Sequence, residues 1–249
     1  LKRAGIIDKR ALVAPRPANL AAWDEVPGEQ RDRGDLEMSV YAAQVEDLDH
    51  GIGQVLRALG RAGLEQNTLV LFMSDNGGLW PRSTSNAPLR AGKAYPYEGG
   101  IREPLIIKWP GPIQRGTTCS VPVSSIDFFP TFVELAGAKL PGPVDGRSLV
   151  PLLRQSGTIE REALFWHYPH YWSNNRVRPY GAVRAGDWKL IELYEDMRVE
   201  LYNLKNDLGE AHDLAKERPE KAAELRTLLH NWRQSVNAQM PAPNPDFPR

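Results

Sequence analysis

The stretch Thr68-Leu69-Val70-Leu71-Phe72-Met73, followed at once by Ser74-Asp75-Asn76-Gly77-Gly78, decides the fold class of this chain. A short apolar run rich in β-forming residues and without polar alternation indicates a strand covered on both faces, as in a parallel sheet. Apolar residues at three- and four-residue steps from Asp35 to Leu59 predict a helix before it, ended by Gly60 or Gly63. A helix followed by a buried strand is typical of an α/β fold.

The remainder of the first 155 residues alternates irregular segments with short apolar runs. Residues 105–109 are predicted to form a second buried strand and residues 119–123 a third, and helical spacing predicts a helix over 126–136. Prolines interrupt residues 1–34, which are predicted to be irregular. Two or three strands are too few for a sheet covered on both faces, so we expect further strands of this sheet to lie outside the chain.

From about residue 156 the pattern changes to short strands separated by tight turns, which predicts an antiparallel meander. The predicted strands are residues 163–168, 181–184, 188–194 and 199–202. A last helix begins near Pro219 and presents one apolar face, which we expect to lie on the meander. The chain is therefore predicted to comprise two domains, residues 1–155 and residues 156–249.

Charge balance and cysteine content exclude several classes of function. Lys and Arg number 31, as do Asp and Glu, so the formal net charge is zero and no nucleic-acid partner is expected. Hydrophobic residues at 41% and charged residues at 25% are typical of a globular chain, and no membrane span is expected. A single cysteine, Cys119, allows no internal disulfide. Because the chain begins at Leu1, without Met or an apolar signal segment, we expect a piece of a longer protein.

Asp75 and Asn76 follow the first strand directly, where ligand sites of open α/β sheets lie. A carboxylate and an amide oxygen side by side suit Ca²⁺ or Mg²⁺. Gly77-Gly78 allows the backbone to turn sharply at this point. The alternative is a simple turn, since each of these residues is a turn former.

Lys93 lies in about thirty residues without periodicity between the two predicted strands, and loops of this length are commonly functional. Its compact ammonium suits sulfate or phosphate oxygens, and the alternative is a solvated loop lysine. Glu98, Arg102 and Glu103 are predicted to form ion pairs that fix the same loop.

The segment His167-Tyr168-Pro169-His170-Tyr171-Trp172 gathers histidines and aromatic rings around a proline. Aromatic rings at the rim of a pocket stack on sugars, and the imidazoles of His167 and His170 can donate to hydroxyl or sulfate oxygens. A packed seam between domains explains the same residues, so both interpretations stay open.

Several motifs in a fixed order resemble the C-terminal half of type I, formylglycine-dependent sulfatases of the arylsulfatase kind, within the alkaline-phosphatase-like superfamily. The motifs are Tyr41-Ala42-Ala43, Asp49-His50-Gly51-Ile52-Gly53, Asn67-Thr68-Leu69-Val70, Ser74-Asp75-Asn76-Gly77-Gly78, Pro88-Leu89-Arg90-Ala91-Gly92-Lys93, Tyr97-Glu98-Gly99-Gly100-Ile101-Arg102, Trp109-Pro110-Gly111, Ile126-Asp127-Phe128-Phe129-Pro130-Thr131, Asp145-Gly146-Arg147-Ser148-Leu149, Trp188-Lys189-Leu190-Ile191 and Glu200-Leu201-Tyr202-Asn203-Leu204 with Asp207 and Glu210. The resemblance implies an α/β fold with a partial alkaline-phosphatase-like sheet, flanking helices and a small C-terminal antiparallel α+β subdomain.

The resemblance also implies a site. Asp75 and Asn76 match metal ligands, for Ca²⁺ rather than Mg²⁺, and Lys93 matches a lysine that contacts the sulfate. The family's nucleophile is a formylglycine hydrate made from Cys or Ser in a C/S-x-P-x-R motif. Cys119 lacks the Pro and Arg of that motif and is predicted to be a small buried hydrophobic residue. The nucleophile, the histidine base and the acidic metal ligands are expected in an N-terminal part outside this chain, which alone should be inactive.

These observations predict a C-terminal fragment of a sulfuric ester hydrolase for small-molecule or carbohydrate sulfate esters. One alternative is a phosphonate or phosphodiester hydrolase of the same superfamily, and another is a non-catalytic domain that binds glycans or a partner. The resemblance implies a periplasmic, secreted or lysosomal protein.

Overall fold

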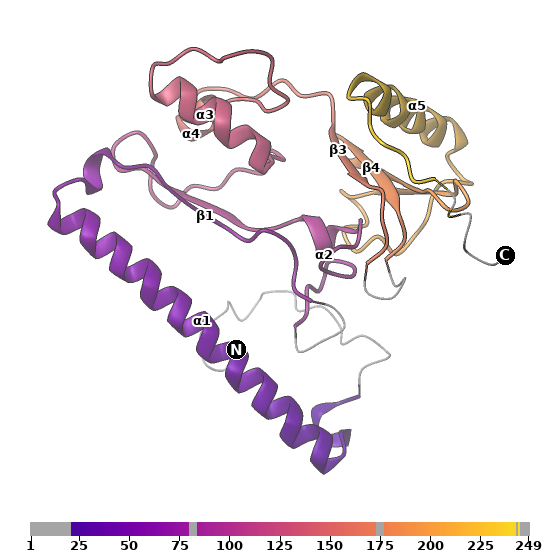
Figure 1. Cartoon of the computed structure of the whole chain (residues 1–249), viewed down its shortest axis with the longest axis horizontal. Coiled ribbons are helices and arrows are strands. Elements are labelled where there is room, and N and C mark those ends of the chain that lie inside the picture. Colours follow the sequence, from indigo (N-terminus) through magenta and orange to yellow (C-terminus); the bar gives the residue numbers. More distant parts are fainter. Residues whose placement is uncertain (1–20, 80–83, 173–176, 243, 245–249) are drawn as a thin grey trace.

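The chain is described by a computed structural model that covers residues 21–79, 84–172, 177–242 and 244 (Figure 1). The α-helices are α1 (Gly28–Arg61), α2 (Glu98–Ile101), α3 (Phe128–Leu135), α4 (Val150–Leu153) and α5 (Pro219–Ser235). Short 3₁₀ helices are η1 (Trp23–Glu25), η2 (Glu65–Asn67) and η3 (Ser125–Asp127). The strands are β1 (Val70–Met73), β2 (Leu105–Lys108), β3 (Leu164–Tyr168), β4 (Tyr180–Ala185), β5 (Trp188–Leu193) and β6 (Val199–Asn203).

In the first region, β1 and β2 form an antiparallel pair in which Val70 lies opposite Lys108 and Met73 opposite Leu105. The prediction of a parallel neighbour is therefore wrong for this pair, and residues 119–123 contain no strand. A continuous apolar run indicates that both faces of a strand are apolar, but it carries no information on the direction of the neighbouring strand. Within the described residues these faces stay partly open, and Ile106 is 61% exposed.

Helix α1 extends for 34 residues and buries none of them. It begins at Gly28, earlier than predicted, because residues 29–33 are polar helix formers that contribute no apolar periodicity. The Arg31 side chain donates to the carbonyl oxygen of Val26 at 2.9 Å and holds the first turn. Apolar residues on the helix, Leu36 and Leu48 among them, remain exposed.

Asp127 organises the segment around α3. Its carboxylate, fully buried, accepts hydrogen bonds from the amides of Ser124 and Arg147, both at 2.8 Å, and pairs with the guanidinium of Arg161. These contacts join the start of α3 to the segment before α4 and to the approach to β3. One carboxylate thus fixes three parts of the chain that are distant in sequence.

The second region is a four-stranded antiparallel sheet in the order β3-β4-β5-β6, which confirms the predicted meander. Helix α5 covers one face, where Leu225 and Leu229 pack against apolar residues of the strands such as Leu190. On the opposite face, around Ile191 and Tyr202, the covering residues come from the first region. They are Ala94, Tyr95 and Tyr97.

The described residues thus form the mixed α/β arrangement predicted from the sequence, with an antiparallel C-terminal sheet. The described part of the segment between β1 and β2 packs against that sheet through Ala94, Tyr95 and Tyr97, so the two regions share a core on this face. The division at residues 155 and 156 stays a prediction. None of the helices in the described part of the chain combines the length and the hydrophobicity that a membrane-spanning helix needs.

Candidate active site

The Asp75-Asn76 turn follows β1 directly, as predicted. The Ser74 hydroxyl donates to the carbonyl oxygen of Asn76 at 2.9 Å, and the Gly77 amide donates to the carbonyl oxygen of Gly100 at 3.2 Å. The Asp75 side chain is exposed, whereas Oδ1 of Asn76 is buried and has no hydrogen-bond partner. Buried amide oxygens are normally satisfied. An unsatisfied amide oxygen beside a carboxylate is available to a hard cation.

Glycines let three backbone segments approach closely behind this turn. A Cβ atom on Gly77 would clash with the carbonyl oxygen of Gly99, and one on Gly99 would meet the carbonyl oxygen of Ala91 at 2.6 Å. A Cβ atom on Gly100 would clash with the carbonyl oxygen of Tyr95. The site therefore needs glycine at these positions for space, because none of the three has a positive φ.

The segment that carries Lys93 is held against the turn by Asn86. The Asn86 amide side chain accepts from the Gly78 amide at 2.9 Å and donates to the carbonyl oxygens of Gly78 at 3.1 Å and Ala91 at 2.9 Å. The Lys93 amide donates to the same Gly78 carbonyl at 3.1 Å. Its side chain is exposed and, among the described residues, has no hydrogen-bond or ion-pair partner. A free ammonium thus lies on a segment fixed to the Asp75-Asn76 turn.

Glu103 differs from its prediction, because it forms no ion pair within the described part of the chain. Burial raises its pKa above the ordinary value of 4.5, and the nearby negative charge of Asp75 raises it further. Glu103 thus adds a carboxylate, rather than a salt bridge, to the surroundings of the turn. Two carboxylates and an unsatisfied amide oxygen are a donor set that suits Ca²⁺.

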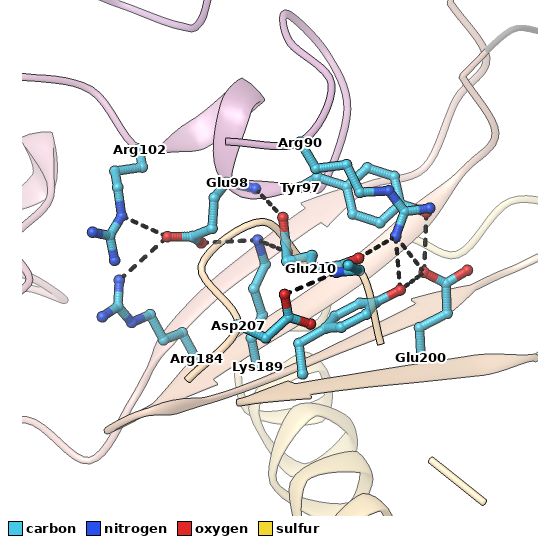
Figure 2. A network of polar contacts seen from close by, with 11 residues as sticks. Arg90, Tyr97, Glu98, Arg102, Arg184, Lys189, Glu200, Asp207 and Glu210 are labelled. Atoms are coloured by element: carbon cyan, nitrogen blue, oxygen red, sulfur yellow. Dashed lines mark hydrogen bonds and ion pairs between the residues drawn. The ribbon is translucent and has the colours of Figure 1, made fainter. Parts of the chain in front are cut away.

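A buried ion network lies behind the lysine loop, by which we mean residues 90–98 (Figure 2). Lys189 on β5, fully buried, places its ammonium 2.9 Å from Oε1 of Glu98 and 2.8 Å from Oε1 of Glu210. The second oxygen of Glu98 pairs with Arg102 at 2.7 Å, as predicted, and with Arg184 at 3.6 Å. Burial opposes ionisation of Glu98, but Lys189 and Arg102 outweigh it and hold its pKa below the ordinary value.

The other end of the lysine loop is held by Arg90. Its guanidinium lies 3.7 Å from the ring centre of Tyr97 and donates to the Tyr202 hydroxyl and the Glu210 carbonyl oxygen, both at 2.9 Å. Both phenols donate to Glu200, Tyr97 at 3.0 Å and Tyr202 at 2.7 Å. Burial raises the pKa of each phenol and the Glu200 charge adds to the effect, so both stay protonated as donors.

The two histidines of the aromatic segment are placed differently. His167 contacts the Tyr194 hydroxyl through Nδ1 at 2.7 Å and the Gln239 carbonyl oxygen through Nε2 at 2.8 Å. Because a carbonyl only accepts, we assign the proton to Nε2, and both ring nitrogens are used within the chain. This geometry favours the packing interpretation for His167. His170 is exposed, with its ring centre 4.0 Å from that of Tyr168.

Neither Lys189 nor Arg90 could be assigned to a polar network from the sequence alone. A lysine inside the apolar run of β5 is a local signal that a buried partner exists, but it does not identify that partner. Cys119, predicted to be buried, is exposed. Within the described ranges, no group of three or more His, Cys, Asp or Glu side chains is placed to hold a metal ion.

The Asp75-Asn76 turn and its adjoining lysine segment lie together on a mixed α/β scaffold, which is consistent with the resemblance to sulfatases. Family models agree: "Sulfatase" matches residues 16–138 and "N-sulphoglucosamine sulphohydrolase, C-terminal" matches residues 91–239. The second match alone spans more than half of the chain. The chain belongs to the sulfatase family of the alkaline-phosphatase-like superfamily.

Individual sulfatases are similar to 60–82% of the chain. A "Sulfatase" of Formosa agariphila is 42% identical over 223 residues, covering 80% of this chain and 40% of that protein. The N-acetylglucosamine-6-O-sulfatase of Bacteroides thetaiotaomicron is 32% identical over 210 residues, covering 82% and 37%. Human arylsulfatase A is 43% identical over 153 residues, covering 60% and 29%. The chain thus spans two fifths or less of the length of these relatives.

Solved structures give the same result. Ps i-CgsB in complex with k-i-k-neocarrahexaose superposes with a TM-score of 0.69 at 32% identity, covering 81% of this chain and 44% of that chain. BT4656 in complex with its substrate D-glucosamine-2-N,6-O-disulfate gives 0.64 at 26%, covering 88% and 50%. A putative sulfatase from Bacteroides thetaiotaomicron gives 0.68 at 21% identity and supports the fold alone.

Proposed function

We propose that this chain is the C-terminal portion of a sulfuric ester hydrolase that acts on sulfated carbohydrates. The observation that carries the proposal is the buried, unsatisfied Oδ1 of Asn76 beside Asp75. The free ammonium of Lys93 belongs to a backbone bonded to Gly78, which follows this turn. Cation ligands and an anion-binding lysine on adjoining backbone are what a sulfate group requires.

In this proposal Asp75 and Asn76 hold Ca²⁺, which when bound supplies positive charge next to the sulfate oxygens. The Lys93 ammonium binds another sulfate oxygen and stabilises the charge that develops there during transfer. Ca²⁺ takes six to eight oxygen ligands, more than this turn offers. The remaining acidic ligands, the formylglycine nucleophile and the histidine base are assigned to an N-terminal part of a longer protein.

The carbohydrate preference rests on the relatives and on one surface residue. One relative is an N-acetylglucosamine-6-O-sulfatase, and two structural neighbours contain sugars. His170, exposed beside Tyr168, is the histidine available to a sugar, whereas both ring nitrogens of His167 already have partners. Family members of this kind also suggest a periplasmic, secreted or lysosomal location.

The test uses the full-length protein with an aryl sulfate, a sulfated sugar and an aryl phosphate. We expect sulfate ester turnover that chelation abolishes and Ca²⁺ restores. Asn76→Ala should raise the Ca²⁺ concentration needed for activity. Lys93→Ala should lower kcat/KM about 10²- to 10³-fold, the usual cost of removing a charge-stabilising donor. Lys205→Ala, on an exposed turn, is the matched lysine control and should behave as wild type.

Two results would contradict the proposal. One is turnover of the aryl phosphate without turnover of either sulfate ester. The other is an Asn76→Ala variant whose Ca²⁺ requirement equals that of the wild type.

A further inference from the structure

We infer that Lys189, together with Arg90, positions Lys93 for the sulfate group, so that the C-terminal sheet controls the geometry of the site in the first region. This inference rests on the proposed function. Neither residue is assigned a contact with the substrate. Both act through the lysine loop, whose two ends they hold.

The two ends of the lysine loop are bonded to the same part of the C-terminal region. At one end, Arg90 donates to the carbonyl oxygen of Glu210 at 2.9 Å. At the other end, the Glu98 amide donates to the Glu210 carboxylate at 2.6 Å. Glu210 therefore receives both ends of the loop, one through its backbone and one through its side chain (Figure 2).

Lys189 keeps this arrangement electrically balanced. Its ammonium lies between the carboxylates of Glu98 and Glu210, and all three side chains are at most 1% exposed. Glu98 has two further cationic partners, Arg102 and Arg184. The Glu210 carboxylate has Lys189 as its one ion-pair partner in the described part of the chain. Without Lys189 its charge would be buried next to Glu98 and uncompensated, which is strongly unfavourable.

Backbone hydrogen bonds fix both the base of the lysine loop and Lys93 itself. The Gly99 amide donates to the carbonyl oxygen of Arg90 at 2.9 Å, which closes the lysine loop at its base. The Lys93 amide, inside the loop, donates to Gly78 at 3.1 Å. Ala91 and Ala94, on either side of Gly92-Lys93, have φ values of 58° and 70°. Such left-handed conformations are unfavourable for alanine and persist where the surrounding contacts impose them.

Removing the Lys189 charge should therefore separate Glu210 from Glu98 and displace the lysine loop from Gly78. A displacement of about 1 Å of a group that contacts substrate can lower the rate by about 100-fold. The loss of rate caused by removing the Lys189 charge occurs only if Lys93 is present, because it arises from the displacement of Lys93. A general folding defect would instead lower the rate whether or not Lys93 is present, so the two explanations can be distinguished.

The experiment is a double-mutant cycle on the full-length enzyme, with kcat/KM for an aryl sulfate as the readout. The variants are Lys189→Met, Lys93→Ala and the combination of both. We expect Lys189→Met to lower kcat/KM about 10- to 100-fold in the wild-type background. In the Lys93→Ala background, Lys189→Met should lower kcat/KM by less than about threefold, because the side chain that it displaces is already absent.

Arg226→Met is the matched control, since it also removes a cation from a buried carboxylate of β5. Arg226 donates to Glu192 at 2.6 Å on the face of the sheet that α5 covers, away from the lysine loop. Its effect on kcat/KM should be the same factor with and without Lys93.

A second cycle with Arg90→Gln tests the other end of the loop on a partly exposed side chain. If Lys189→Met fails to fold, this second cycle provides the test of whether the loop positions Lys93.

The possible failures are distinguishable. A wild-type enzyme without sulfatase turnover, or a Lys93→Ala variant of full activity, overturns the proposed function and this inference with it. An active enzyme that depends on Lys93 but loses the same factor from Lys189→Met in both backgrounds overturns the inference alone. If Lys189→Met does not fold, equal losses from Arg90→Gln in both backgrounds have the same meaning.

Discussion

The Lys93 amide donates a hydrogen bond to the carbonyl oxygen of Gly78 over 3.1 Å, which joins the lysine loop to the Asp75-Asn76 turn. This bond brings the Lys93 ammonium, which suits anions, onto backbone that adjoins the Asp75-Asn76 turn, which suits a cation. The proposed cation ligands and the proposed sulfate-binding ammonium are thus set by a common local geometry, and changes in that geometry should affect both.

Asn86→Ala should disrupt this geometry without touching a charged group. The variant loses three hydrogen bonds, two to Gly78 and one to Ala91, and leaves partly buried backbone groups unpaired. We expect a loss of about 2–4 kcal/mol in unfolding free energy and weaker Ca²⁺ binding. Urea unfolding and Ca²⁺ titration of the full-length protein measure the two effects. Unchanged Ca²⁺ affinity would show that Asn86 does not shape the turn.

Gly99→Ala should be poorly tolerated because its added methyl group has no space. The new Cβ atom would clash with the carbonyl oxygen of Arg90 and lie 2.6 Å from that of Ala91. Overpacking against backbone typically costs 1–3 kcal/mol or more, so we expect a destabilisation of at least about 3 kcal/mol. Gly142→Ala is the control, since nothing lies within 4 Å of its Cβ position. Urea midpoints that shift equally for the two variants would contradict the crowding argument.

Glu192 should make the stability of the protein sensitive to acid. Burial works to raise its pKa, but hydrogen bonds from Arg226, His230 and Arg233 prevail and hold the pKa below 4.5. A depressed pKa means that the stabilisation is fully present above pH 4.5 and is lost as the pH falls through the lower folded-state value. Unfolding free energy should therefore decline in this acid range.

Glu192→Gln provides the comparison for the acid effect. The variant should be less stable at pH 7 by about 3 kcal/mol, because Arg233 is left buried without its carboxylate. Below pH 4.5 its stability should change less with pH than that of the wild type. Urea unfolding at several pH values measures both slopes, and parallel slopes would exclude Glu192 as the source.

Arg161→Met should destabilise the segment around α3. The substitution leaves the fully buried Asp127 carboxylate with two amide donors and no cation. Breaking a buried ion pair from one side typically costs 3–5 kcal/mol, and we expect a loss in this range in urea unfolding. Adding Asp127→Asn should recover part of it. If Arg161→Met alone is as stable as the wild type, the amides of Ser124 and Arg147 are sufficient to stabilise the buried Asp127 carboxylate.

The elements that could be predicted from the sequence are those specified by local pattern. The meander of β3 to β6 follows from short apolar runs and tight turns, and α5 from a proline start and one apolar face. The direction of β2 relative to β1 could not be predicted, because an apolar run is the same in either orientation. The start of α1 could not be predicted either, because its first turns contain no apolar residues.

At the candidate site, the sequence indicated the residue types but not their environment. Asn76 was a candidate by position, and its unsatisfied oxygen appears only when the whole turn is folded. His167 was ambiguous until its partners, Tyr194 and Gln239, were placed from distant segments. The burial of Lys189 depends on Glu98, 91 residues away in sequence, so no local pattern could reveal it.

The buried cluster of Glu98, Lys189 and Glu210 joins the two regions, so it also affects where the polypeptide can be cut. Cutting the chain at the predicted boundary, between residues 155 and 156, would leave Glu98 in one piece and both Lys189 and Glu210 in the other. The sheet face around Ile191 and Tyr202 would lose Tyr95 and Tyr97, which cover it in the intact chain. Each piece would then expose groups that only the other can satisfy. Two separately produced halves should therefore be poorly soluble alone and recover their structure by complementation when refolded together.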